Sequence, residues 1–163
     1  MARAKTDPDA VVAVVAHELG HVKHQDVLRG TSIAAVGVGA FVLLLAIALT
    51  TTRGRRIFAP RSDRSVDLVG GVVLFLAITT TAPFAAAPVG NLVSRRIEAS
   101  ADVYALQATD NVPAFVRMQR DLATSNLSRL DSSWWQTIMF ATHPDPVWRI
   151  AQARTWQQHE QHR

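Results

Sequence analysis

The 163-residue sequence contains no cysteine, which excludes disulfide bonds and thiolate metal ligands. Strand signals are also nearly absent, so we expect an all-α protein. The N-terminal residues MARAKTDPD hold no contiguous apolar region, and we expect no cleavable signal peptide. There is no internal repeat and no low-complexity segment. A chain of this length can form one domain with a modest core, and we expect a single domain over residues 1–163.

Lysine is scarce, because the net charge of +4 comes from 15 Arg and 2 Lys set against 13 acidic residues. A basic balance suits nucleic acid or the anionic surface of a membrane. The sequence has no aromatic-basic signature of RNA binding, and its apolar fraction of 48% favours lipid. We therefore expect a lipid bilayer as a partner and no nucleic acid. The bias toward Arg, with abundant Ala and Val, indicates a GC-rich bacterial source.

The motif that carries chemistry is HELGH, in which His17 and His21 are four residues apart on a predicted helix. Two imidazoles at this spacing lie on one helical face and can bind the same metal ion. Glu18 then lies beside the attacking water, where a general base is needed. The alternative is a solvated helix face that carries these three residues by chance.

The bounds of this helix follow from its flanking residues. Asp7 and Pro8 predict its start, as an N-cap and a proline at the first helical position. Gly30 predicts its end, so that the helix covers residues 7–29.

Two apolar runs follow the His motif. Residues 31–50 carry no charge, and 20 helical residues span about 30 Å, the thickness of a bilayer core. Residues 68–92 form the second run, interrupted by Pro83 and Pro88, which a membrane helix tolerates where neighbours satisfy the freed carbonyls. The threonines at 79–81 can hydrogen-bond their own helix. The alternative is a buried core helix, which a domain this small could hardly enclose, so we expect a transmembrane helical hairpin.

Two spans are an even number, so the His motif and residues 92–163 emerge on the same side of the membrane. We expect a multi-pass protein of the cell membrane with its catalytic side in the cytoplasm, although the basic residues of the loop and flanks do not decide the orientation. Residues 92–163 are predicted to form amphipathic helices over 92–107, over 113–125 with Asn111 as cap, and from Asp145-Pro146 onward.

A catalytic zinc usually takes three protein ligands and keeps a fourth position open for water. His24 follows His17 by seven residues, a rise of about 10.5 Å that is too long for one metal ion. The better candidate is Glu98, and Asp102 lies on the same helical face four residues later. A first carboxylate could bind the metal while the second accepts a hydrogen bond from a ligand histidine. The alternative is an exposed helix whose charges form surface ion pairs.

Three blocks in order resemble a known family. HELGH, the apolar hairpin, SRRIEASAD and then THPDPVWRI are similar to the integral-membrane zinc endopeptidases, which comprise the type I CAAX prenyl proteases and the HtpX heat-shock proteases. The resemblance extends from about Asp9 to Ala151, and LATSNLSRLD with WWQTIMFATHP looks closer to the CAAX branch. It implies a gluzincin-like helical metalloprotease domain with a transmembrane hairpin inserted between the metal-binding motifs.

The resemblance also implies roles for single residues. His17, His21 and Glu98 would bind one zinc ion per chain, and Glu18 would activate the attacking water. Asp102 would support a ligand histidine.

Two further roles come from the last block. His143 would stabilise the oxyanion, and Arg149 would support that part of the site. Trp148 stands where the family usually has Glu, which removes an ion-pair partner near Arg149. Trp134 and Trp135 are expected to anchor the chain at the membrane interface, with a substrate groove as the alternative.

We therefore expect a zinc-dependent metalloendopeptidase that acts on membrane-associated polypeptides. The alternative is a truncated, inactive relative that serves as a zinc-binding or interaction subunit. Members of the family have further membrane spans and an edge strand before the His motif, whereas 16 residues precede His17 here. Missing N-terminal spans or a partner subunit are accordingly expected.

Overall fold

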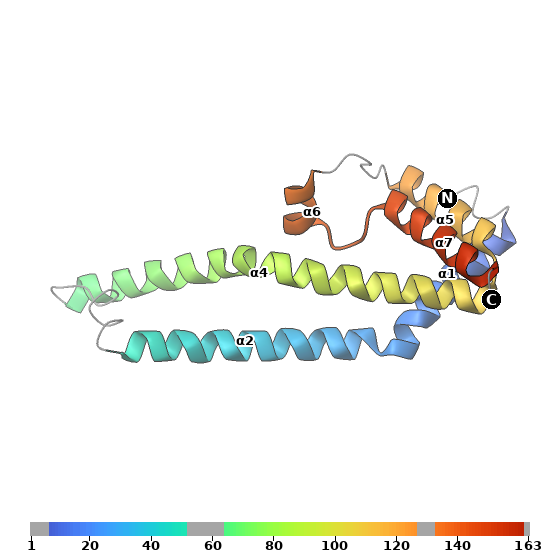
Figure 1. Ribbon diagram of the computed structural model, residues 1–163. Helices are drawn as coiled ribbons and strands as arrows, with labels where there is room; N and C mark the ends of the chain where they lie inside the picture. The colour runs from blue at the N-terminus through green and yellow to red at the C-terminus, as the bar shows by residue number, and fades with distance from the viewer. Residues whose placement is uncertain (1–6, 52–63, 127–132, 162–163) are drawn as a thin grey trace. The chain divides into compact units, whose positions relative to one another are not determined.

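The computed structural model describes residues 7–51, 64–126 and 133–161, and within these ranges it contains helices and no strand (Figure 1). The all-helical prediction is confirmed for this part of the chain. The elements are α1 (Pro8–His24), α2 (Asp26–Thr50), α4 (Arg64–Thr109), α5 (Val112–Ser125), α6 (Trp134–Phe140) and α7 (Pro146–Gln161).

The chain divides into two compact units. One comprises Met1–Val27 together with Pro88–Arg163, and the other comprises Leu28–Ala87. The single domain over residues 1–163 stays a prediction. Both the His motif and the acidic pair Glu98 and Asp102 belong to the first unit.

Helix α1 begins as the sequence predicts, because the Asp7 carboxylate accepts a hydrogen bond from Ala10 N at 3.2 Å. The helix buries a narrow face of small residues at a spacing of three and four: Ala10, Ala13, Ala16 and Gly20. A Cβ on Gly20 would lie 3.1 Å from the Cα of Ala101 in α4. The two backbones therefore approach closely, and this approach brings the histidines of α1 over α4.

Helix α1 ends earlier than predicted. The sequence predicts a helix over residues 7–29, whereas α1 stops at His24 and α2 starts at Asp26. Gln25 between them adopts the left-handed conformation (φ 55°), and its N–H bonds back to carbonyls of the last turn. Gly30 lies inside α2, where it ends no helix.

The core of the first unit lies where α5 packs against α1 and α7 (Figure 1). Asn111 caps α5 as predicted by accepting from Ala114 N at 3.1 Å, and Asp145 accepts from Val147 N at 2.7 Å at the start of α7. Phe115 is the largest apolar side chain buried in this core. The other members of the core are mostly small: Ala10, Ala13, Ala16, Ala105, Leu106, Val112, Met118 and Ala153.

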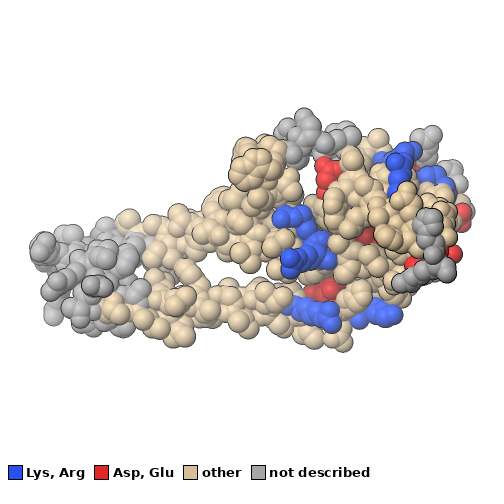
Figure 2. Space-filling view, in the orientation of Figure 1, with Lys and Arg blue, Asp and Glu red and all other residues tan. Residues whose placement is uncertain are grey.

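The second unit is built from parts of α2 and α4. By length and composition, Asp26–Ile47 and Phe75–Thr109 are long and apolar enough to cross a membrane. Residues 30–51 and 72–90 contain no Lys, Arg, Asp or Glu, and Figure 2 shows an uncharged surface over their described part. The membrane hairpin itself stays a prediction.

Helix α4 is longer than predicted. The sequence predicts separate helices over 68–92 and 92–107, whereas one helix covers both and includes Pro83 and Pro88. The hydroxyls of the threonines at 79–81 donate to carbonyls three and four residues earlier, as predicted.

Helix α6 is absent from the sequence-based prediction. Its signal is a capping box, since Ser133 N donates to the side chain of Gln136 at 3.2 Å just before an apolar run. A helix of seven residues is too short for apolar periodicity to show it.

Candidate metal centre

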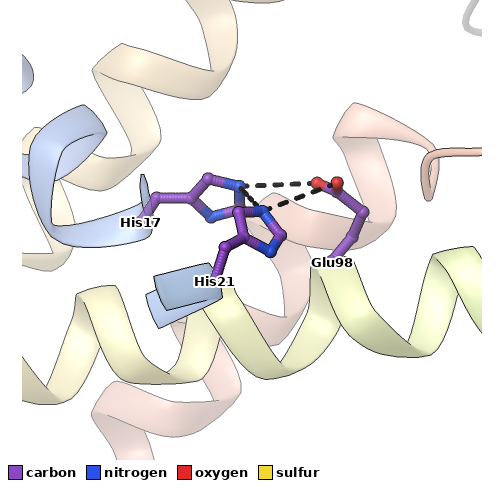
Figure 3. A group of neighbouring side chains, drawn as sticks. All are labelled: His17, His21 and Glu98. Atoms are coloured by element: carbon purple, nitrogen blue, oxygen red, sulfur yellow. Dashed lines mark hydrogen bonds and ion pairs between the residues drawn. The ribbon is translucent and has the colours of Figure 1, made fainter. Parts of the chain in front are cut away.

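Two histidines of α1 and one glutamate of α4 meet in the first unit (Figure 3). Nε2 of His17 lies 3.2 Å from Nε2 of His21. The Glu98 carboxylate faces both rings, with Oε2 3.5 Å from His17 Nε2 and Oε1 3.7 Å from His21 Nε2. Each residue thus offers one ligand atom, and these atoms lie within 4.8 Å of one another.

The donor types of this cluster suit a metal ion such as zinc. Zinc bonds to nitrogen and oxygen are about 2.1 Å long, which sets neighbouring ligand atoms about 3.4 Å apart in a tetrahedron. The two imidazole nitrogens are 3.2 Å apart, close to that value, and each lies near a different oxygen of the Glu98 carboxylate, at 3.5 and 3.7 Å. Two imidazoles and one carboxylate form a donor set that could hold zinc.

Each histidine has a carboxylate at its other ring nitrogen. His17 Nδ1 lies 3.0 Å from Asp102 Oδ1, and His21 Nδ1 lies 2.9 Å from Asp26 Oδ2. A carboxylate at Nδ1 favours the tautomer with its proton there, which leaves the Nε2 lone pair for a metal. Sequence reasoning missed Asp26, because five residues after His21 it would face elsewhere on an unbroken helix.

A buried ion pair supports this arrangement. Arg149 of α7 donates to both oxygens of Asp102, with Nε 2.6 Å from Oδ2. Both residues are buried, and Arg149 Nη2 also lies 3.7 Å from Glu98 Oε2. With its amide oxygen turned toward the guanidinium, the orientation that satisfies both groups, Gln119 accepts from Arg149 Nε and Nη2 at 3.1 Å. Sequence reasoning missed Gln119, since a polar residue of α5 carries no motif.

The carboxylates of the site raise the pKa of His17. Burial by itself would lower the pKa of this imidazole, but hydrogen bonds to Asp102 and Glu98 outweigh burial and raise the pKa to about 9. Without a metal ion, His17 therefore holds a proton at neutral pH. A cation in the same place would meet the same two carboxylates.

A cleft of about 510 Å³ opens beside the three facing side chains. The exposed Glu18 and His143 line it, as does the buried Arg149. His143 is at the rim, since its side chain is 65% exposed while its Nδ1 lies 3.2 Å from Glu98 Oε1. On the side of α5 the wall is mainly apolar, with Met118 and Leu122. A peptide in this cleft would have its backbone beside the acid, the imidazole and the metal ligands.

Other predicted residues lie outside this group. The His24 ring packs against Tyr104 with ring centroids 6.1 Å apart, and His24 is not a member of the metal-ligand cluster. Trp134 and Trp135 lie on α6, are exposed, and are not among the residues that line the cleft.

The chain is similar to known proteins over most of its length. The model of the family described as Peptidase family M48 matches residues 3–157. The chain is 30% identical over 150 residues to the uncharacterized metalloprotease YhfN of Bacillus subtilis, an alignment that covers 91% of this chain and 35% of YhfN. It is 32% identical over 165 residues to a protease HtpX homologue of Desulforapulum autotrophicum, with 91% of this chain and 51% of that protein covered. The chain thus spans about a third to a half of the length of these relatives.

Proposed function

We propose a function from one premise: the chain belongs to peptidase family M48, and it is accordingly a metallopeptidase by family. The proposal is a zinc-dependent endopeptidase that hydrolyses peptide bonds of membrane-associated polypeptides. The observation that carries it is the cluster of His17, His21 and Glu98, whose ligand atoms lie within 4.8 Å of one another, with a carboxylate behind each imidazole. These three residues would hold one zinc ion per chain, which when bound polarises a peptide carbonyl and acidifies water.

In this proposal, other residues of the cleft transfer protons, donate to the oxyanion or position a metal ligand. Glu18 takes a proton from the attacking water and passes it to the amine of the leaving peptide. His143 donates a hydrogen bond to the oxygen of the scissile carbonyl as negative charge develops there. Arg149 holds Asp102, which in turn fixes the ring of His17.

Replacing Glu18 separates metal binding from catalysis. Glu18→Gln is expected to retain about one zinc per chain by elemental analysis and to lose cleavage of an unfolded protein substrate. Asp9→Asn, on the same helix but outside the cleft, is the matched control and should keep both properties. Full proteolysis by Glu18→Gln would refute this mechanism. A wild-type chain that binds zinc and cleaves nothing would instead support the inactive, zinc-binding relative.

The class of substrate would distinguish the two branches of the family that the chain resembles. The block LATSNLSRLD looks closer to the CAAX prenyl proteases, whereas the Desulforapulum relative is named a protease HtpX homologue. We propose the CAAX branch, and it predicts faster cleavage of a farnesylated peptide than of the same peptide without its lipid. Equal rates for both peptides would favour a general membrane-protein protease.

The two apolar helices support a place in the cell membrane. The proposal puts both ends of the catalytic unit on the cytoplasmic side. Because the chain has no cysteine, a single Arg154→Cys substitution on exposed α7 gives one labelling site. A membrane-impermeant maleimide should label it after lysis and leave it unlabelled in intact spheroplasts. Labelling of intact spheroplasts would show the opposite orientation.

A further inference from the structure

One face of α4 carries four polar residues at a spacing of four, three and four: Asn91, Arg95, Glu98 and Asp102. At 3.6 residues per turn, this spacing keeps all four on one side of the helix. Glu98 and Asp102 face the histidines of α1. The two residues that precede them on this face have no role in the proposed function so far.

Asn91 and Arg95 hold the C-terminal end of α6. Arg95 Nη1 donates to the carbonyl oxygens of Thr137 at 2.9 Å and Ala141 at 2.7 Å. Asn91 Nδ2 donates to the carbonyl oxygen of Ile138 at 3.1 Å, and Asn91 is itself buried. The last carbonyls of a helix need partners from outside it, and a cation is favoured there by the helix dipole.

Little else in the described structure fixes α6. None of its residues is buried, and its largest side chains face outward, with Trp134 77% and Phe140 62% exposed. Burial of apolar surface therefore contributes little to its position. Three hydrogen bonds from one face of α4 join this helix to α4.

The position of α6 determines that of the chain directly after it. Ala141, held by Arg95, precedes His143 by two residues, and Thr137 and Ala141 line the same cleft as His143. We infer that Asn91 and Arg95 are positioning residues for His143: they fix α6 on α4, so that His143 stays beside Glu98. This inference rests on the proposed function, in which His143 donates to the developing oxyanion.

The contact between His143 and Glu98 needs residues that keep His143 in place. His143 is mostly exposed and lies 3.2 Å from Glu98 Oε1, so few neighbours restrain it. A donor that drifts by about 1 Å can lose about 100-fold in rate. The metal ligand Glu98 and the residues that restrain His143 are all on α4. One rigid helix therefore sets the distance between His143 and Glu98.

Kinetics of Arg95→Ala in two backgrounds tests the inference. In the wild-type background, kcat should fall about 10- to 100-fold, with KM and zinc content unchanged. In the His143→Ala background the same change should cost nothing further, because the donor is already absent. Arg96→Ala is the matched control, since Arg96 is the exposed neighbour with the same charge, and it should leave kcat unchanged. An equal fall of kcat in both backgrounds, or no fall in either, would overturn the inference.

A spin label tests the same contact without relying on proteolysis. Phe140→Cys introduces one exposed cysteine into a cysteine-free chain, and a nitroxide there reports the mobility of α6. Arg95→Ala should sharpen the spectrum, and Arg96→Ala should not. Asn91→Ala, which removes one bond, should act in the same direction if Arg95→Ala fails to fold. An unchanged spectrum in the Arg95 and Asn91 variants refutes the positioning role. A parent protein that cleaves no peptide refutes the proposed function instead.

Discussion

Asp26 Oδ2 lies 2.9 Å from His21 Nδ1, although five residues along an unbroken helix would place the two side chains on different faces. The contact exists because Gln25 takes a left-handed conformation and turns the chain at the end of α1. This backbone conformation normally favours glycine. A glutamine there costs free energy that the rest of the fold must offset. The site gains a second carboxylate behind its imidazoles.

Replacing this carboxylate should weaken the metal site without removing it. Asp26→Asn is expected to lower zinc affinity about 10- to 100-fold, since a carboxylate behind a ligand imidazole orients the ring and raises its basicity. Competition with a chromophoric chelator measures the change. Asp9→Asn on the same helix should leave the affinity as it is, and an equal loss in both variants would show that the contact is incidental.

Zinc binding should depend on pH through His17. Its pKa in the metal-free site is about 9, so a proton must leave before the imidazole can bind zinc. Apparent zinc affinity should therefore fall about tenfold for each unit of pH below 9, as long as one proton is displaced. Chelator competition between pH 6.5 and 9 checks the slope, and a flat profile over this window would contradict it.

The stability of the metal-free protein should have the opposite trend. The pKa of His17 is raised above its ordinary value of 6.5 in the folded state. Its contribution is therefore fully present below pH 6.5 and is lost as pH rises through about 9. Thermal unfolding in detergent with chelator should show a lower midpoint at pH 9 than at pH 6.5.

The buried ion pair between Arg149 and Asp102 should matter far more than an exposed one. Arg149→Ala removes the cation that contacts both oxygens of this buried carboxylate, which typically costs about 3–5 kcal/mol of unfolding free energy. Arg117 forms a similar pair with Asp7 at 2.6 Å, but its side chain is 45% exposed and solvent screens the charges. Arg117→Ala is therefore the matched control and should change stability little. Equal losses in the two variants would contradict this account of the buried pair.

The close approach of α1 and α4 predicts the effect of a methyl group at Gly20. Its Cβ would lie 3.1 Å from the Cα of Ala101, and backbone cannot move aside as a flexible side chain can. Gly20→Ala should thus destabilise the protein by about 1–3 kcal/mol and weaken zinc binding, because the helix with the histidines is displaced. At Gly30 nothing lies within 4 Å of the added atom. Gly30→Ala should leave zinc binding unchanged, and a similar loss there would refute the packing argument.

Local features of the fold could be predicted from the sequence because a few neighbouring residues encode them. Asp7, Asn111 and Asp145 cap helices at the predicted places, and each cap depends on residues two or three positions away. This dependence on neighbouring residues also limits which features of the fold could be predicted. Gln25 breaks a helix that propensity alone would continue, and α6 is too short to show a period.

The spacing of four residues already places His17 and His21 on one helical face, and Glu98 and Asp102 on another. The partners that these side chains contact follow from the packing of the helices. Asp26 contacts His21 because a left-handed turn lies between them. Gln119 of α5 accepts a hydrogen bond from Arg149 of α7, and Arg95 of α4 donates to a carbonyl of α6. Such contacts join segments far apart in the chain or on opposite sides of a turn. They depend on how closely small side chains let the helices pack, which no single segment encodes.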